Sequence, residues 1–191
     1  MSKEGIAQKS NNRSRKWTQR FLLTSIIQGA IAVSLTIMLA AFVISTPYAG
    51  YLISSILDNP SIGYIEITAL AGLGLYFLAG VLGTGVASFF YHYFESHLGK
   101  NFDGLTNGLA WIHLIMTNIG VSFASLTMIY AGYIGDLTIF PKEIGGFGMS
   151  AIQASNNLLN QFIVPVGAML LVVSIGAICG GLGFIITFVK R

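Results

Sequence analysis

Residues 162–189 read FIVPVGAMLLVVSIGAICGGLGFIITFV and contain no charged side chain. A helix needs about 20 consecutive apolar residues to cross the roughly 30 Å hydrocarbon core of a bilayer, and this stretch is longer than that. Because lipid offers no hydrogen-bond partners, a spanning segment must satisfy its own backbone groups, as a helix does. The stretch therefore predicts a transmembrane helix.

Three further apolar stretches, at 21–46, 64–91 and 105–133, predict three more spans. The chain is 54% hydrophobic and only 9% charged, whereas a soluble domain carries about 25% charged residues. The first stretch exceeds the roughly 7–15 apolar residues of a signal peptide, so we expect it to be retained. We predict an all-α, polytopic membrane protein with four transmembrane helices over 21–191 and a basic tail at 1–20.

The segments between the spans are predicted as connections. Residues 48–57 form a short apolar piece, too short to span, that we expect at the membrane interface. Residues 92–104 and 134–161 are expected to be loops, the second of them rich in Gly and Asn and containing Pro141.

Basic residues gather on one side of this topology. Six of the ten lie in the tail, namely Lys3, Lys9, Arg13, Arg15, Lys16 and Arg20. With the N-terminus inside, the inner segments also hold Lys100, Lys190 and Arg191, and the outer segments hold only Lys142. The positive-inside rule then predicts cytoplasmic N- and C-termini. The Asn-rich, low-charge composition with a short basic tail favours the plasma membrane of a bacterium or archaeon. The tail is expected to contact anionic lipid, and no basic face predicts nucleic-acid binding.

Small residues recur at four-residue spacing on two spans. One stripe comprises Ala79, Gly83 and Ala87, and the other comprises Gly176 and Gly180. Small residues let helices approach closely in lipid, where apolar area alone gives no association. We expect the first stripe to pack inside the bundle and the second, on the terminal helix, to meet a partner subunit.

Few side chains in the spans can carry chemistry. His113 and Asn118 are the main polar groups well inside a span, and we expect both to make helix–helix hydrogen bonds. His92 and His97 are five residues apart, which does not place both on one helical face, so interfacial side chains are favoured over a metal site. The single cysteine, Cys179, excludes an intrachain disulfide. We predict no catalytic, cofactor-binding or metal-binding residue, and a chain that is not an enzyme by itself.

Residues 91–136 carry Gly99, Ile112-His113, Gly120-Val121 and a Gly132–Gly135 pair, and this pattern resembles the C-terminal helices of haem–copper terminal oxidase subunit I. The likeness extends over about the last 120 residues. At the positions where that family has its haem-ligand histidines, this chain has Leu73 and Leu75. Where the family has arginines at the haem propionates, it has Thr138 and Ile139. The resemblance implies a relative without haem.

The predicted function is therefore that of a non-catalytic accessory subunit of a respiratory-type membrane complex, a haem–copper terminal oxidase, with other integral-membrane subunits as partners. An accessory subunit of another membrane oxidoreductase, such as a copper membrane monooxygenase, is the alternative. A small transporter or channel subunit is less favoured, because the spans offer few polar residues to line a midplane site.

Overall fold

The computed structural model describes residues 16–45 and 60–190, and in these ranges it contains helices and no strand. Helix α2 spans Lys16–Ser45, α6 spans Leu105–Ile139 and α8 spans Asn160–Val189. Four helical segments are long and apolar enough to cross a membrane: Lys16–Phe42, Ile67–His97, Leu105–Ile139 and Asn160–Val189. The predicted all-α class with four membrane-spanning helices is confirmed for the described chain.

The second span is one continuous rod made of four segments. It runs through α4 (Pro60–Leu75), the π-helix η1 (Tyr76–Leu82), α5 (Gly83–His92) and a second π-helix η2 (Tyr93–His97). The prediction that a loop begins at residue 92 is wrong, since the helix continues to His97. It ends there because Gly99, with a φ of +59°, takes a left-handed conformation that reverses the chain.

The loop between the third and fourth spans is also shorter than predicted. Helix α6 continues to Ile139 and ends before the Phe140-Pro141 pair, as expected because proline disfavours a helical residue before it. A 3₁₀ turn η3 (Lys142–Ile144), a single turn α7 (Ala151–Ala154) and the π-helical η4 (Ser155–Leu159) then lead into α8. The predicted interfacial piece at 48–57 and most of the basic tail lie outside the described residues.

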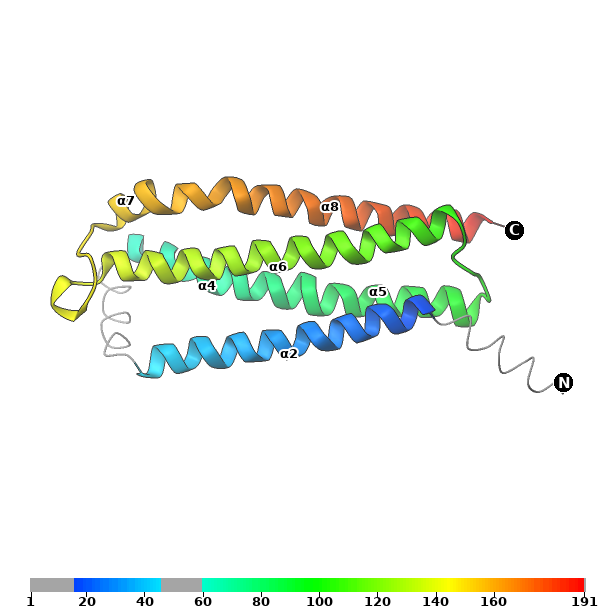
Figure 1. The fold of residues 1–191 in the computed structure, drawn as a ribbon, viewed down its shortest axis with the longest axis horizontal. Coiled ribbons are helices and arrows are strands. Elements are labelled where there is room, and N and C mark those ends of the chain that lie inside the picture. Colours follow the sequence, from blue (N-terminus) through cyan, green and yellow to red (C-terminus); the bar gives the residue numbers. More distant parts are fainter. Residues whose placement is uncertain (1–15, 46–59, 191) are drawn as a thin grey trace.

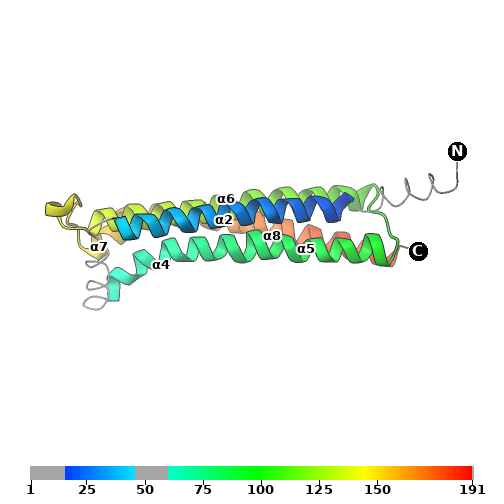
Figure 2. The ribbon, with the colours of Figure 1, turned by 90° about the horizontal axis from the view of Figure 1, so that it is seen from below.

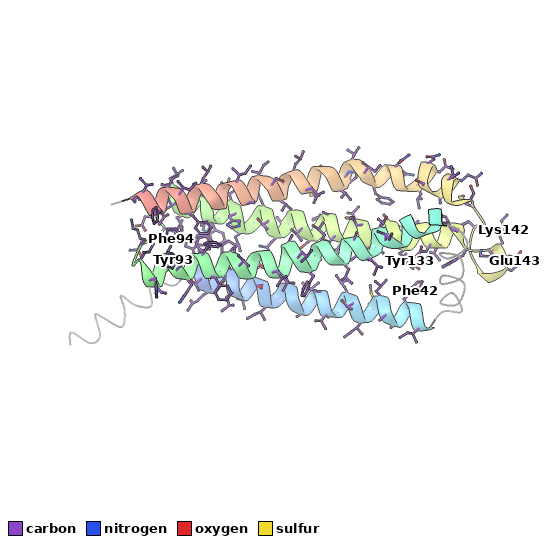
Figure 3. The ribbon with its side chains drawn as sticks, turned by 180° about the vertical axis from the view of Figure 1, so that it is seen from behind. Phe42, Tyr93, Phe94, Tyr133, Lys142 and Glu143 are labelled. Carbon is purple, nitrogen blue, oxygen red and sulfur yellow. The ribbon has the colours of Figure 1, made fainter. Side chains whose placement is uncertain are left out.

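The four rods lie side by side along one axis (Figure 1). The turned view in Figure 2 shows α2 and α6 on one side and the α4–α5 rod on the other, with α8 visible between them. The start of α2, the end of η2, the start of α6 and the end of α8 meet at one end, which we call the basic end because Lys16, Arg20, Lys100 and Lys190 lie there. Lys142 lies at the opposite end, with Glu143 (Figure 3).

The core has two clusters at different heights. The larger one lies at the basic end. Its large aromatic rings come from the first, second and fourth spans and from the connection before the third: Trp17, Phe21, Tyr91, Phe94 and Phe102, with Phe184 packed against them, while α6 contributes Ala110 and Leu114. Figure 3 shows Phe94 at this crowded end of the bundle. The smaller cluster, nearer the middle, consists of Ala32, Tyr76 and Val121 with Ala79, Val81 and Val173. Large apolar side chains elsewhere on the spans are exposed, as expected of surfaces that face lipid.

Candidate functional site

A buried carboxylate at the basic end caps the start of α2. Glu95 is only 4% exposed, and its Oε1 accepts the backbone N–H of Trp17 at 3.0 Å. Its Oε2 accepts the backbone N–H of Thr18 at 3.1 Å and the Thr18 hydroxyl at 2.8 Å. The first N–H groups of a helix lack partners within the helix and carry a partial positive charge. Glu95 therefore supplies from the second span both the hydrogen bonds and the charge that the first helix needs.

Next to this cap, an arginine packs against two indole rings that touch each other. The Arg20 Cζ is 4.6 Å from the ring centroid of Trp17 and 4.5 Å from that of Trp111. The two indoles meet edge-on, with centroids 5.2 Å apart and planes at 82°. Both distances are within the range of cation–π attraction. The guanidinium is thereby held at the junction of α2 and α6.

One turn deeper, His113 of α6 lies among rings from three other elements. Its Nδ1 is 3.4 Å from the Tyr91 hydroxyl of α5, within hydrogen-bonding distance. The ring centroid of Phe21 is 4.9 Å from that of His113, and that of Phe184 is 6.3 Å from it. The ring is therefore fixed in position, and its fourth neighbour is the backbone of Gly180 on α8.

A second polar set lies nearer the middle of the bundle and joins α2 to α6 and to η1. Gln28 Nε2 donates to Asn118 Oδ1, and Asn118 Nδ2 donates to the Leu114 carbonyl at 2.5 Å. A Cβ on Gly80 would lie 2.7 Å from Gln28 Oε1, so only glycine leaves room for this side chain. Gln28 Oε1 has no hydrogen-bond partner in the described chain.

The π-helix η1 leaves backbone carbonyls that side chains satisfy. Ser25 of α2 donates through its hydroxyl to the Val81 carbonyl at 2.9 Å, and Thr84 donates to the carbonyls of Gly80 and, at 3.2 Å, Val81. Hydroxyl groups commonly fill this role where the regular α-helical bonding is interrupted. The wider turn thus links the second span to the first.

The Gly176–Gly180 face packs on α6 inside the described bundle, which differs from the prediction that it lies open for a partner subunit. Both glycines are buried and face α6. A Cβ on Gly176 would lie 2.7 Å from Thr117 Oγ1, and one on Gly180 would lie 2.6 Å from His113 Cε1. The prediction failed because a terminal helix was expected to expose its small residues, whereas α8 uses them to reach α6.

The Ala79–Gly83–Ala87 stripe is not a single packing face, so that prediction is corrected too. Ala79 packs on the middle cluster and Ala87 is buried, but Gly83 is exposed and a Cβ there would meet only the Leu78 carbonyl of its own rod. The π-helical turns of η1 shift the register. The buried positions are instead Gly80, Thr84 and Ser88.

The other residues that the sequence analysis singled out either lie away from the aromatic cluster at the basic end or are not arranged to bind a ligand. His92 and His97 are both exposed; Ser96 Oγ is 3.3 Å from His92 Nδ1, and His97 packs on Tyr93. Across the described ranges, no three His, Cys, Asp or Glu side chains come together as a metal site. Leu73 and Leu75 are half-buried, while Thr138 and Ile139 are buried near the opposite end.

Comparison with protein-family models, with curated proteins and with solved structures finds no match for this chain. The oxidase resemblance therefore remains a prediction.

Sequence reasoning missed the two most developed features of the basic end. Glu95 lies in the segment 92–104 that the sequence predicts as a loop, and Trp17 lies in the predicted basic tail at 1–20. The signals available in the sequence were a single acidic residue, Glu95, near the end of the second span and the backbone N–H groups at the start of the first span, which need acceptors. Only the folded arrangement brings the two together.

Proposed function

We propose that this chain is a non-catalytic accessory subunit of a respiratory-type membrane complex, and that the complex is a haem–copper terminal oxidase. The observation that carries the first part is the way the interior is filled. In the described bundle, glycine backbones and aromatic rings close the helix contacts, and the side chains of Glu95, Ser25 and Gln28 bond to neighbouring helices. Such an interior favours a fixed scaffold over a transport path, which needs polar groups around a midplane site. The oxidase part rests on the resemblance of residues 91–136.

The same proposal includes the orientation and the location. The basic end, with Lys16, Arg20, Lys100 and Lys190, faces the cytoplasm, and Lys142 faces outward. This orientation follows the positive-inside rule in a multi-pass plasma-membrane protein. Residues 1–20 contact anionic lipid, and the partners are other integral-membrane subunits.

The test is purification of the tagged chain from native membranes in mild detergent, with the absorbance spectrum and mass spectrometry as readouts. We expect a stable complex with haem bands and oxidase subunits in fixed proportion, whereas the chain purified alone shows no Soret band. Gly180→Leu is the matched control, because the leucine would collide with His113 and both the bundle and the complex should be lost.

Each alternative gives a different result. A copper-containing complex without haem would favour the other oxidoreductase. A chain that purifies alone from membranes in which it is abundant would refute the accessory role. A Soret band with stoichiometric iron in the isolated chain would refute the non-catalytic assignment.

A further inference from the structure

The guanidinium of Arg20 is held by rings, and within the described ranges its N–H donors have no acceptor. Its cation–π contacts there are with the indoles of Trp17 and Trp111. A guanidinium carries five N–H donors in its plane, and contact with a ring face does not use them. Arg20 is half-buried, so these donors lie close to the protein surface.

The nearby acid does not neutralise this charge. Both oxygens of Glu95 already accept hydrogen bonds from the start of α2, and Arg20 forms no ion pair within the described ranges. Lys16, one turn earlier on α2, is exposed, so a second cation lies on the same side of the helix. Lys100 is engaged elsewhere, because its ammonium donates to the Phe188 and Lys190 carbonyls at the end of α8.

The depth of the site matches that of lipid headgroups. Trp17 and Arg20 lie in the first turns of a membrane-spanning helix, and Trp111 lies near the start of another. Indole rings at such positions are typical of the membrane–water interface, where phosphates are found. Trp111 is 40% exposed, so one wall of the site faces the surrounding lipid.

We propose that the Arg20 guanidinium, packed against both Trp17 and Trp111 at the basic end, binds the phosphate of an anionic phospholipid, with Lys16 adding a second positive charge. A guanidinium and a phosphate can form two parallel, charge-assisted hydrogen bonds. The proposal deepens the proposed lipid contact of residues 1–20 by assigning it to a defined site. It does not depend on the accessory-subunit role.

The test uses the protein's own fluorescence. The chain has two tryptophans, and both line this site. The protein is reconstituted in phosphatidylcholine vesicles that contain a minor share of phosphatidylglycerol. In one preparation the phosphatidylglycerol carries bromine near the headgroup end of its acyl chains, and in the other an equal amount of the phosphatidylcholine does. We expect local enrichment of phosphatidylglycerol to be about fivefold, which corresponds to roughly 1 kcal/mol for one basic side chain at an anionic surface. Brominated phosphatidylglycerol should therefore quench more strongly.

Three variants separate the site from its surroundings. Arg20→Gln should make the two brominated lipids quench equally, while Lys142→Gln at the opposite end should behave like the wild type. A variant in which Lys3, Lys9, Arg13 and Arg15, the basic residues that precede α2, are all changed to Gln should keep most of the preference. If the preference follows the tail and not Arg20, the defined site is refuted and the general tail contact survives.

Two measurements on the wild type remain decisive even if Arg20→Gln does not fold. Equal quenching by the two brominated lipids would refute the proposal. At matched ionic strength, sodium phosphate and sodium chloride should weaken the preference to the same extent, because both act by screening. Loss of the preference with phosphate alone would indicate a site for free phosphate, and would overturn the assignment to a lipid.

Discussion

Adding a single methyl group at Gly180 should destabilise the bundle, while the same change at Gly181 should not. A Cβ on Gly180 would lie 2.6 Å from Cε1 and 2.7 Å from Cγ of His113, and closer still to Nδ1. Ordinary carbon contacts are about 3.5–4.0 Å, so the imidazole would have to retreat by about 1 Å. Phe21 and Phe184 pack against that ring and restrict the retreat. A Cβ on Gly181 would meet nothing within 4 Å.

The matched pair isolates the packing cost. Replacing glycine by alanine favours a helix by up to about 1 kcal/mol at either position, so this gain cancels in the comparison. Overpacking a filled site costs about 1–3 kcal/mol. We therefore expect Gly180→Ala to unfold more easily than Gly181→Ala by about 1–3 kcal/mol. The assay is unfolding by SDS in mixed micelles, followed by far-ultraviolet circular dichroism.

A double-mutant cycle tests the cause. In a His113→Ala background the ring is absent, so Gly180→Ala should lose most of its cost relative to Gly181→Ala. Equal unfolding midpoints of the two alanine variants would refute the reasoning. So would a difference that persists undiminished without the imidazole.

Two further predictions concern the basic end and the topology. Glu95→Gln should destabilise the protein by about 2 kcal/mol, since it removes a charged acceptor from the start of α2. The control is Glu143→Gln, at an exposed site, in the same SDS titration. Equal unfolding midpoints of the two variants would contradict the capping role of Glu95. In a Cys179→Ala background, Ser150→Cys should react with an impermeant thiol reagent added outside intact cells. Labelling only after permeabilisation would reverse the proposed orientation.

The spans could be predicted from sequence because their signal is local. A run such as 162–189 is apolar at nearly every position, and the length of a bilayer-crossing helix is set by the bilayer itself. Helix ends were less accurate: residues 92–97 are polar enough to resemble a loop, but η2 keeps them helical and buries Phe94 and Glu95. The hydrophobicity of a segment does not reveal that a polar residue in it is helical and buried because its hydrogen-bond partner lies on another span.

Choosing the packing face of the second span needed information that the sequence lacks. Ala79, Gly83 and Ala87 are spaced by four, but so are Gly80, Thr84 and Ser88, one position along the chain. An α-helix turns every 3.6 residues, so a strict four-residue spacing drifts around it. The π-helical turns of η1 change that drift. Without the structure, the two adjacent faces could not be distinguished.

The two outer helices are attached to the bundle by different means. Helix α8 approaches α6 through glycines, at Gly176 and Gly180 on its own side and at Gly120 on the other, where an added Cβ would lie 2.9 Å from the Met169 carbonyl. Helix α2 is approached differently. A Cβ on its own Gly29 would make an ordinary contact of 3.7 Å with Val81, and the glycines of the second span that come closest to it, Gly80 and Gly85, face the polar ends of the Gln28 and Ser25 side chains and not its backbone.

Hydrogen bonds at three heights hold α2 instead: Trp17 and Thr18 with Glu95, Ser25 with the Val81 carbonyl, and Gln28 with Asn118. In lipid, such side-chain bonds between helices contribute about 0.6–2 kcal/mol each. Polar bonds can be exchanged for equivalent ones, whereas a glycine contact depends on the shape of one particular neighbour. Polar substitutions can therefore alter the position of α2 in the bundle and leave the packing between α6 and α8 intact.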